Sequence, residues 1–131
     1  MIESISQFLK MLTSDDEKSQ LALRSEEASE IVWWQILESH PEHVRTVSLN
    51  KTLPHAILSR LAIHPCANVR ADIANRRSLP HELFLMLASD KDESVRARVA
   101  WNKKTPMKIL KILASDLEEI VFEPARARLE K

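Results

Sequence analysis

Apolar residues recur three and four positions apart in short segments of this chain. In the segment "VRADIA", Val69, Ile73 and Ala74 fall on one side of a helix, and in "VRARVA" Val95 and Val99 do the same. An α-helix brings positions i, i+3 and i+4 to one face, so this spacing predicts short amphipathic helices. The polar residues between the segments then mark the junctions between helices.

These segments recur at a nearly constant period. The endings "LTSD", "LESH", "LAIH", "LASD" and "LASD" lie 24 to 26 residues apart, and their last residues are Asp15, His40, His64, Asp90 and Asp116. Self-similarity at this period is typical of stacked repeat proteins. Each period holds two predicted helices. The first follows the junction, and the second begins at a proline: Pro54, Pro80 or Pro106.

Polar residues at the expected helix ends predict specific caps. N-caps are expected at Asp90, Asp116 and Thr105, whose side-chain oxygens suit the free N–H groups of a first turn. The chain contains no glycine, and asparagine is then the best residue for a left-handed C-cap. We therefore expect such caps at or near Asn50, Asn75 and Asn102.

The recurring pattern "VRxxVAxN…TPxxxLxxLAxD" resembles the leucine-rich-repeat variant family of α-solenoids and, more loosely, HEAT-like repeats. The resemblance covers residues 40–116 and implies a binding scaffold. Some family members carry an N-terminal cysteine cluster for an iron–sulfur centre. This chain has a single cysteine, Cys66, so no cofactor is expected, and the proline of the family's usual "NP" is absent.

A pair of short helices cannot bury its apolar face alone, whereas stacked pairs bury a continuous core. The sequence therefore predicts an all-α fold, a right-handed α-solenoid (a HEAT-like superhelix) of about four to five two-helix repeats of roughly 25 residues. One domain is expected over residues 1–131. It comprises divergent N-terminal cap units (1–39), three clear repeats (40–115) and a C-terminal cap (116–131) in which Pro124 breaks the helix.

The absence of glycine excludes several classes of function. P-loops and dinucleotide-binding fingerprints need glycine for close approach of the backbone to phosphate. A single cysteine cannot form an internal disulfide. The apolar run "IVWWQIL" is far shorter than a membrane span, and the acidic N-terminal segment lacks a basic leader. We expect no membrane partner, no small-molecule substrate and a cytoplasmic location.

The net charge is zero, but it is unevenly distributed. Residues 1–50 contain nine acidic and four basic residues, whereas residues 51–131 contain ten acidic and fifteen basic ones. One candidate partner-binding surface is therefore the acidic end, made of Asp15, Asp16, Glu17, Glu26, Glu27 and Glu30. The alternative is that these carboxylates are a solvated cap.

A second candidate is a basic ridge in the loops before the prolines: Lys51, Arg76, Arg77, Lys103 and Lys104. Stacked repeats would align these loops along one edge, which suits phosphates or an acidic protein surface. The alternative is a set of ordinary solvated loops.

A third candidate is the second-helix face, whose residues lie away from the predicted core: Ile36, His55, Arg60, His81, Leu85, Met86 and Ile112. This face is more apolar than a solvated surface, so a partner could cover it. The alternative is that neighbouring helices already cover it.

Two further sets of residues were weighed for chemistry. Arg45, Arg70 and Arg96 follow valine in successive repeats, either as a stripe that faces a ligand or as a ladder that pairs with Asp90, Asp116 or main-chain carbonyls. His40, His43 and His64 lack the ligands that would complete a zinc site. No nucleophile–base arrangement is recognisable, so an enzyme is not expected.

These features favour a non-enzymatic protein-binding module. Its most concrete form is a bacterial immunity or inhibitor protein that neutralises a cognate toxin, for example a nuclease. The alternative is a HEAT-like protein that binds nucleic acid through the basic ridge. That alternative needs an exposed tryptophan among Trp33, Trp34 and Trp101, which we expect in the core or in a loop. A third hypothesis is a scaffold that stacks end to end through its oppositely charged ends.

Overall fold

A computed structural model describes residues 1–131, and it is entirely helical. The ten α-helices are α1 (Ile5–Thr13), α2 (Glu17–Ser25), α3 (Glu30–Ser39), α4 (Val44–Ser48), α5 (His55–Leu61), α6 (Ala67–Ala74), α7 (His81–Ala88), α8 (Glu93–Trp101), α9 (Met107–Leu113) and α10 (Glu119–Leu129), with a 3₁₀ turn, η1, at Pro41–His43. The predicted all-α class is confirmed. No helix combines the length and the apolar character that crossing a membrane requires.

The chain divides into two compact units, Met1–Arg60 (unit 1) and Leu61–Lys131 (unit 2). In unit 1, α1 contacts α2 and α3, and α4 contacts α2 and α3. Phe8 and Trp33 are fully buried there and meet edge to face, with ring centroids 6.4 Å apart. This aromatic pair forms the centre of the core of unit 1.

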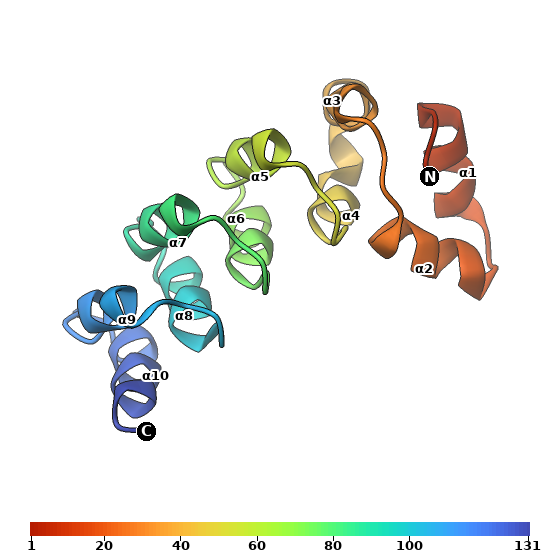
Figure 1. Cartoon of the computed structure of the whole chain (residues 1–131). Coiled ribbons are helices and arrows are strands. Elements are labelled where there is room, and N and C mark those ends of the chain that lie inside the picture. Colours follow the sequence, from red (N-terminus) through yellow and green to blue (C-terminus); the bar gives the residue numbers. More distant parts are fainter. The chain divides into compact units, whose positions relative to one another are not determined.

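Unit 2 has two rows of helices (Figure 1). The first helices of the predicted pairs, α6, α8 and α10, form one row in which α8 contacts both of the others, and α7 and α9 form the second row. The apolar positions predicted from the spacing are buried, as expected: Val69, Ile73, Leu83, Leu87, Val95, Val99, Ile109 and Leu113. The core of unit 2 therefore lies between the two rows.

Buried arginine–aspartate pairs join segments 20 residues apart within unit 2. Arg70 donates from Nε to Asp90 Oδ2 at 2.8 Å and from Nη2 to Oδ1 at 3.1 Å, and Arg96 makes the same pair of bonds to Asp116. The Nη1 groups donate to main-chain carbonyls, that of Arg70 to His64 and that of Arg96 to Asp90. The predicted ladder is thus confirmed for Arg70 and Arg96, whose guanidinium groups are not available to a ligand.

These pairs make the stability of the protein pH-dependent. Burial acts to raise the pKa of Asp116, but hydrogen bonds from Arg96 and from the N–H of Glu118, with the Arg96 charge, together lower it below 3.8. A carboxylate with a lowered folded pKa contributes stability above its unfolded pKa and loses it as the pH falls through the folded value. We expect the free energy of unfolding to fall progressively below about pH 4.

Urea unfolding between about pH 5 and pH 2 measures this effect. Asp116→Asn should show a shallower dependence, because the substitution removes one titrating group with a lowered pKa. Asp15→Asn, at an exposed carboxylate, is the control and should keep the wild-type slope. Equal slopes in all three proteins would contradict the expectation.

The helix N-caps differ from the prediction. Asp92, not Asp90, caps α8, and Glu118, not Asp116, precedes α10. The reason is that the carboxylates of Asp90 and Asp116 are held by arginine, so each helix starts two residues later. Thr105 is also not an N-cap, since its Oγ1 donates to the carbonyl of Val99 at 2.6 Å and α9 starts after Pro106.

The predicted left-handed asparagine caps are wrong, because no residue has a positive φ. Asn75 ends α6 in a right-handed conformation with φ −80°. Asn102 instead reaches the preceding repeat, and its Nδ2 donates to the carbonyls of Ala74 and Arg76, both at 2.7 Å. Asn50 makes equivalent bonds to Leu23 and Glu26, both at 2.9 Å. These side chains connect repeats rather than end helices.

Pro124 does not break the last helix. The helix α10 continues from Glu119 to Leu129 with Pro124 inside it. Proline lacks the N–H that would bond to the carbonyl of Ile120, which costs one backbone hydrogen bond. Pro124 is nevertheless buried beside Val121 and Ala125, and this packing opposes the loss.

Candidate functional site

Unit 2 exposes four large apolar side chains on its second helices. On α7, Leu85 is 47% and Met86 43% exposed, and on α9 Met107 is 63% and Ile112 52% exposed. The opposite sides of the same helices carry the buried core residues, so these four lie on the outer side. Met86 and Ile112 hold equivalent repeat positions on two helices that contact each other. We call these four residues the apolar face.

The other residues of the predicted second-helix face are placed differently. His81 is exposed at the start of α7, beside the apolar face in sequence, and His55 and Arg60 are exposed on α5 in unit 1. Ile36 is fully buried, and its inclusion in the predicted face was wrong. The physical reason is that α3 contacts α1 as well as α4, and these contacts cover more of its surface.

Charged side chains border the apolar face. Lys108 and Lys111 are exposed on α9, at the repeat positions that Glu82 and Leu85 hold on α7. The border along α9 is therefore basic. A partner with apolar residues flanked by acidic ones would match this border.

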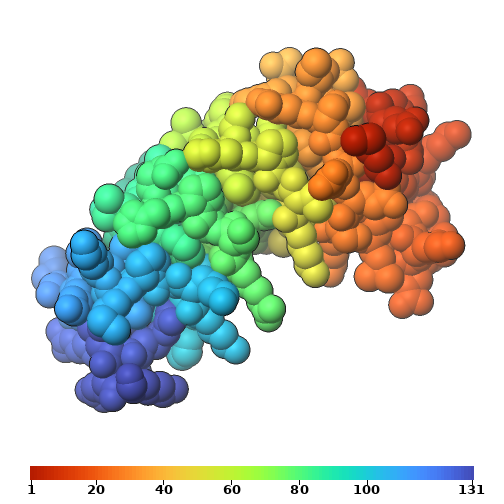
Figure 2. All heavy atoms as spheres, in the orientation of Figure 1, coloured from red at the N-terminus to blue at the C-terminus, as the bar shows by residue number.

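Two loops of the basic ridge lie next to each other in unit 2. The bond from Asn102 Nδ2 to the carbonyl of Arg76 joins the loop before α9 to the loop before α7, and both loops project from the surface in Figure 2. Arg77, Lys103 and Lys104 are exposed. Arg76 is half-buried, and burial lowers the pKa of its guanidinium. Lys51, also exposed, belongs to unit 1.

Arg128 is a contact residue of this edge that sequence reasoning missed. Its guanidinium donates to the carbonyls of Ala100, Asn102 and Lys103. Arg128 lies 26 residues after Asn102, and Asn102 binds the carbonyls at the equivalent positions of the previous repeat. The period therefore carried the signal, although the residue type changed.

Trp101 is exposed, contrary to the expectation that the tryptophans lie in the core or in a loop. It is the last residue of α8, and 66% of its surface is accessible. Trp101 stands 26 residues after Asn75, which is also exposed, so the repeat position could have indicated this. Trp33, in contrast, is fully buried as expected.

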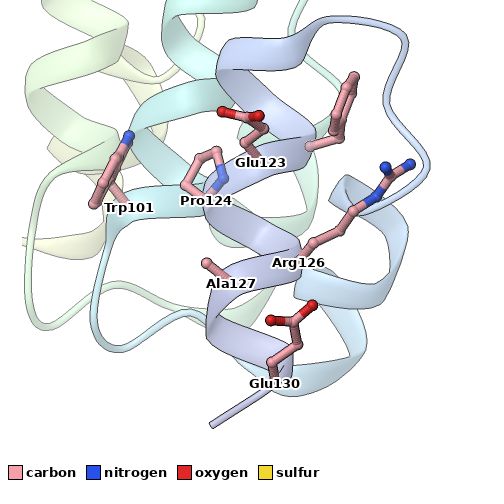
Figure 3. A pocket seen from close by; sticks show the side chains of 7 residues that line it. Trp101, Glu123, Pro124, Arg126, Ala127 and Glu130 are labelled. Atoms are coloured by element: carbon pink, nitrogen blue, oxygen red, sulfur yellow. The ribbon is translucent and has the colours of Figure 1, made fainter.

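Trp101 lines a pocket of about 480 Å³ on the surface of unit 2. The other lining residues come from α10: Phe122, Glu123, Pro124, Arg126, Ala127 and Glu130. Figure 3 shows Trp101 beside Pro124, while Arg126 points away from the indole. The pocket thus combines an exposed aromatic ring with charged side chains.

The acidic end of unit 1 is only partly free for a partner. Asp15, Asp16, Glu17, Glu27 and Glu30 are exposed. Asp16 accepts a hydrogen bond from the N–H of Lys18 and caps α2, and Glu30 accepts one from Trp34 Nε1 at 3.2 Å. Glu26 is half-buried and holds the N-terminal ammonium at 2.7 Å. Part of this acidity therefore serves the helix N-termini, where carboxylates are favourable.

No group of three or more His, Cys, Asp or Glu side chains is arranged to hold a metal ion. His40 and His43 stack at 6.2 Å and both lie near Glu42, whose carboxylate is 3.2 Å from His40 Nδ1. Backbone hydrogen bonding is the main cause of the lowered pKa of Glu42, to which a hydrogen bond from His40 adds. This cluster is exposed and local to η1.

Comparison with known proteins gave no match: no protein-family profile, curated protein or solved structure is significantly similar to the chain.

Proposed function

We propose that this chain is a non-enzymatic protein-binding module, built as a right-handed α-solenoid of two-helix repeats and acting in the cytoplasm. Three observations support the solenoid. They are the 26-residue spacing of Asn102 and Arg128, their bonds to equivalent carbonyls, and the recurring arginine–aspartate pairs. Such repeats present extended surfaces and are used mainly for binding.

The apolar face carries the proposal that the ligand is a protein. Leu85, Met86, Met107 and Ile112 expose aliphatic and thioether groups on two contacting helices, where a purely solvated surface would be polar. Methionine side chains adapt their shape to a bound surface, which suits a binding face. Covering these side chains with a partner removes apolar area from water and drives association.

The test is capture of the partner by the tagged chain from its native cells, with nuclease treatment, at about 150 mM and about 500 mM salt. We expect one stoichiometric protein with the wild type, and at least a tenfold loss of it with Met86→Asp/Ile112→Asp. An aspartate at each position places a charge in the apolar contact, which is costly to bury.

Ser89→Asp/Ser115→Asp is the matched control, because both serines are exposed, are 26 residues apart and lie outside the apolar face. Circular dichroism should show the same helix content in all three proteins. Retention of the partner by the Met86→Asp/Ile112→Asp protein would rule out this face as the binding site.

The concrete form of the proposal is an immunity protein that neutralises a bacterial toxin, for example a nuclease. The exposed carboxylates of Asp15, Asp16, Glu17 and Glu27 support it, because they suit a cationic surface such as a nuclease active site. Expression of the captured protein alone should then stop growth, and co-expression of the chain should restore it. A captured protein without toxicity would leave a binding module of another kind.

Nucleic acid is the alternative ligand, and one observation favours it. Trp101 is exposed two residues before Lys103, which supplies the aromatic side chain that base stacking requires. Fluorescence anisotropy with a labelled oligothymidine, compared between wild type and Lys103→Glu/Lys104→Glu, tests it. Salt-sensitive binding that the double substitution abolishes would favour this alternative over a protein partner.

A further inference from the structure

The pocket at Trp101 is distinct from the apolar face. It is formed by the end of α8 and the outer side of α10, whereas the apolar face lies on α7 and α9. The indole of Trp101, the ring of Pro124 and the methyl group of Ala127 make its apolar floor (Figure 3). Ala127 is small, so it leaves the space beside the indole open.

Two carboxylates without ion-pair partners border this floor. Glu123 and Glu130 are exposed, line the pocket and lie on the same side of α10 as Ala127. They are seven residues apart, which in an α-helix corresponds to about 10 Å along the axis. The pocket therefore has an aromatic wall and a negative charge towards each end.

The nearby arginines do not neutralise these carboxylates. The guanidinium of Arg126 lies 4.2 Å from the ring centroid of Phe122, and its Nε donates to the carbonyl of Ala114 at 2.9 Å. Arg128 directs its donors to the carbonyls of Ala100, Asn102 and Lys103. Both cations are thus held by other partners.

We propose that this pocket binds a basic segment of a protein, with a lysine or arginine side chain against the indole of Trp101. A cation over an indole ring is attracted by the negative face of the ring. Glu123 and Glu130 add charge-assisted hydrogen bonds to the ammonium or guanidinium groups. The same carboxylates repel phosphate, so they select against nucleic acid at this pocket.

The spacing of the carboxylates defines the segment more closely. In a polyproline II conformation, residues three apart lie on the same side, about 9 Å apart. That separation matches the distance between the two carboxylates along α10. The best ligand is therefore an extended segment with two basic residues three positions apart.

The test uses the peptide acetyl-Lys-Pro-Pro-Lys-amide and the full chain labelled with ¹⁵N. The readout is the indole N–H signal of Trp101 in the NMR spectrum, assigned with Trp101→Phe. We expect a saturable shift of this signal, weakened about threefold by Glu123→Gln or Glu130→Gln and about tenfold by both, as exposed charge pairs of modest strength should give. Glu119→Gln, on the same helix but outside the pocket, should bind like wild type.

Two further probes decide the class of ligand. Acetyl-Glu-Pro-Pro-Glu-amide and a ten-nucleotide oligothymidine should leave the Trp101 signal unmoved. A shift with either probe as strong as with the lysine peptide would overturn the proposal, as would no shift with the lysine peptide at several millimolar. Melting curves of the glutamine variants establish that they are folded. The inference does not rest on the apolar face, because its variants lie on other helices.

Discussion

Arg70→Met is expected to lower the free energy of unfolding by about 3–5 kcal/mol, the largest effect of any substitution considered for this protein. The side chains of Arg70 and Asp90 are only 6% and 8% exposed, and two parallel hydrogen bonds join them. Methionine fills a similar volume but leaves the Asp90 carboxylate buried without its counter-ion. The carbonyls of His64 and Pro65 lose a donor as well.

Urea denaturation followed by circular dichroism measures this loss. Arg98→Met is the matched control, because Arg98 is an exposed arginine on α8 in the same unit, and its removal should change stability by less than about 0.5 kcal/mol. The double variant Arg70→Met/Asp90→Leu should recover most of the loss, since it leaves no unpaired buried charge. A loss below about 1 kcal/mol for Arg70→Met would mean that this pair behaves like a surface ion pair.

Asn102→Ala should be the second most damaging change, with a loss of about 2–4 kcal/mol in the free energy of unfolding. Its Nδ2 donates to the carbonyls of Ala74 and Arg76, and its Oδ1 accepts from the N–H of Lys104 at 2.9 Å. Alanine leaves these main-chain groups unpaired, and a buried polar group without a partner is costly.

Asn75→Ala is the control for this prediction, because Asn75 is an exposed asparagine at the end of α6. It should change stability by less than about 0.5 kcal/mol. Asn50→Ala should reproduce the effect of Asn102→Ala in unit 1, where Asn50 binds Leu23 and Glu26. Thermal unfolding of the three variants gives the comparison. Equal losses for Asn75→Ala and Asn102→Ala would show that the bonds between repeats contribute little.

The predicted surfaces were located only in part by the sequence. Leu85, Met86 and Ile112 are exposed, as their positions away from the predicted core indicated. Ile36 held the equivalent position but is buried, because α1 contacts α3, and the repeat pattern contains no information about that extra helix. Trp101 was missed because a large apolar residue at the end of a helix is normally assigned to the core.

The sequence by itself determined the helices and the inner side of each one. The spacing of Val95 and Val99, like that of Leu83 and Leu87, is a local property, and burial of these residues follows from the 3.6-residue turn. The conserved-looking pairing of Arg70 with Asp90 could also be foreseen, since both residues recur at the repeat period.

Only the tertiary structure decided which polar and aromatic side chains connect repeats and which face solvent. Asn75 and Asn102 look alike in sequence, yet Asn75 is exposed and Asn102 is buried against carbonyls from residues 26 and 28 positions earlier. The difference arises because a main-chain carbonyl has no sequence signature, and its position depends on how one helix end packs on the next. The pocket at Trp101 has the same origin, since it exists only where α10 packs beside the end of α8.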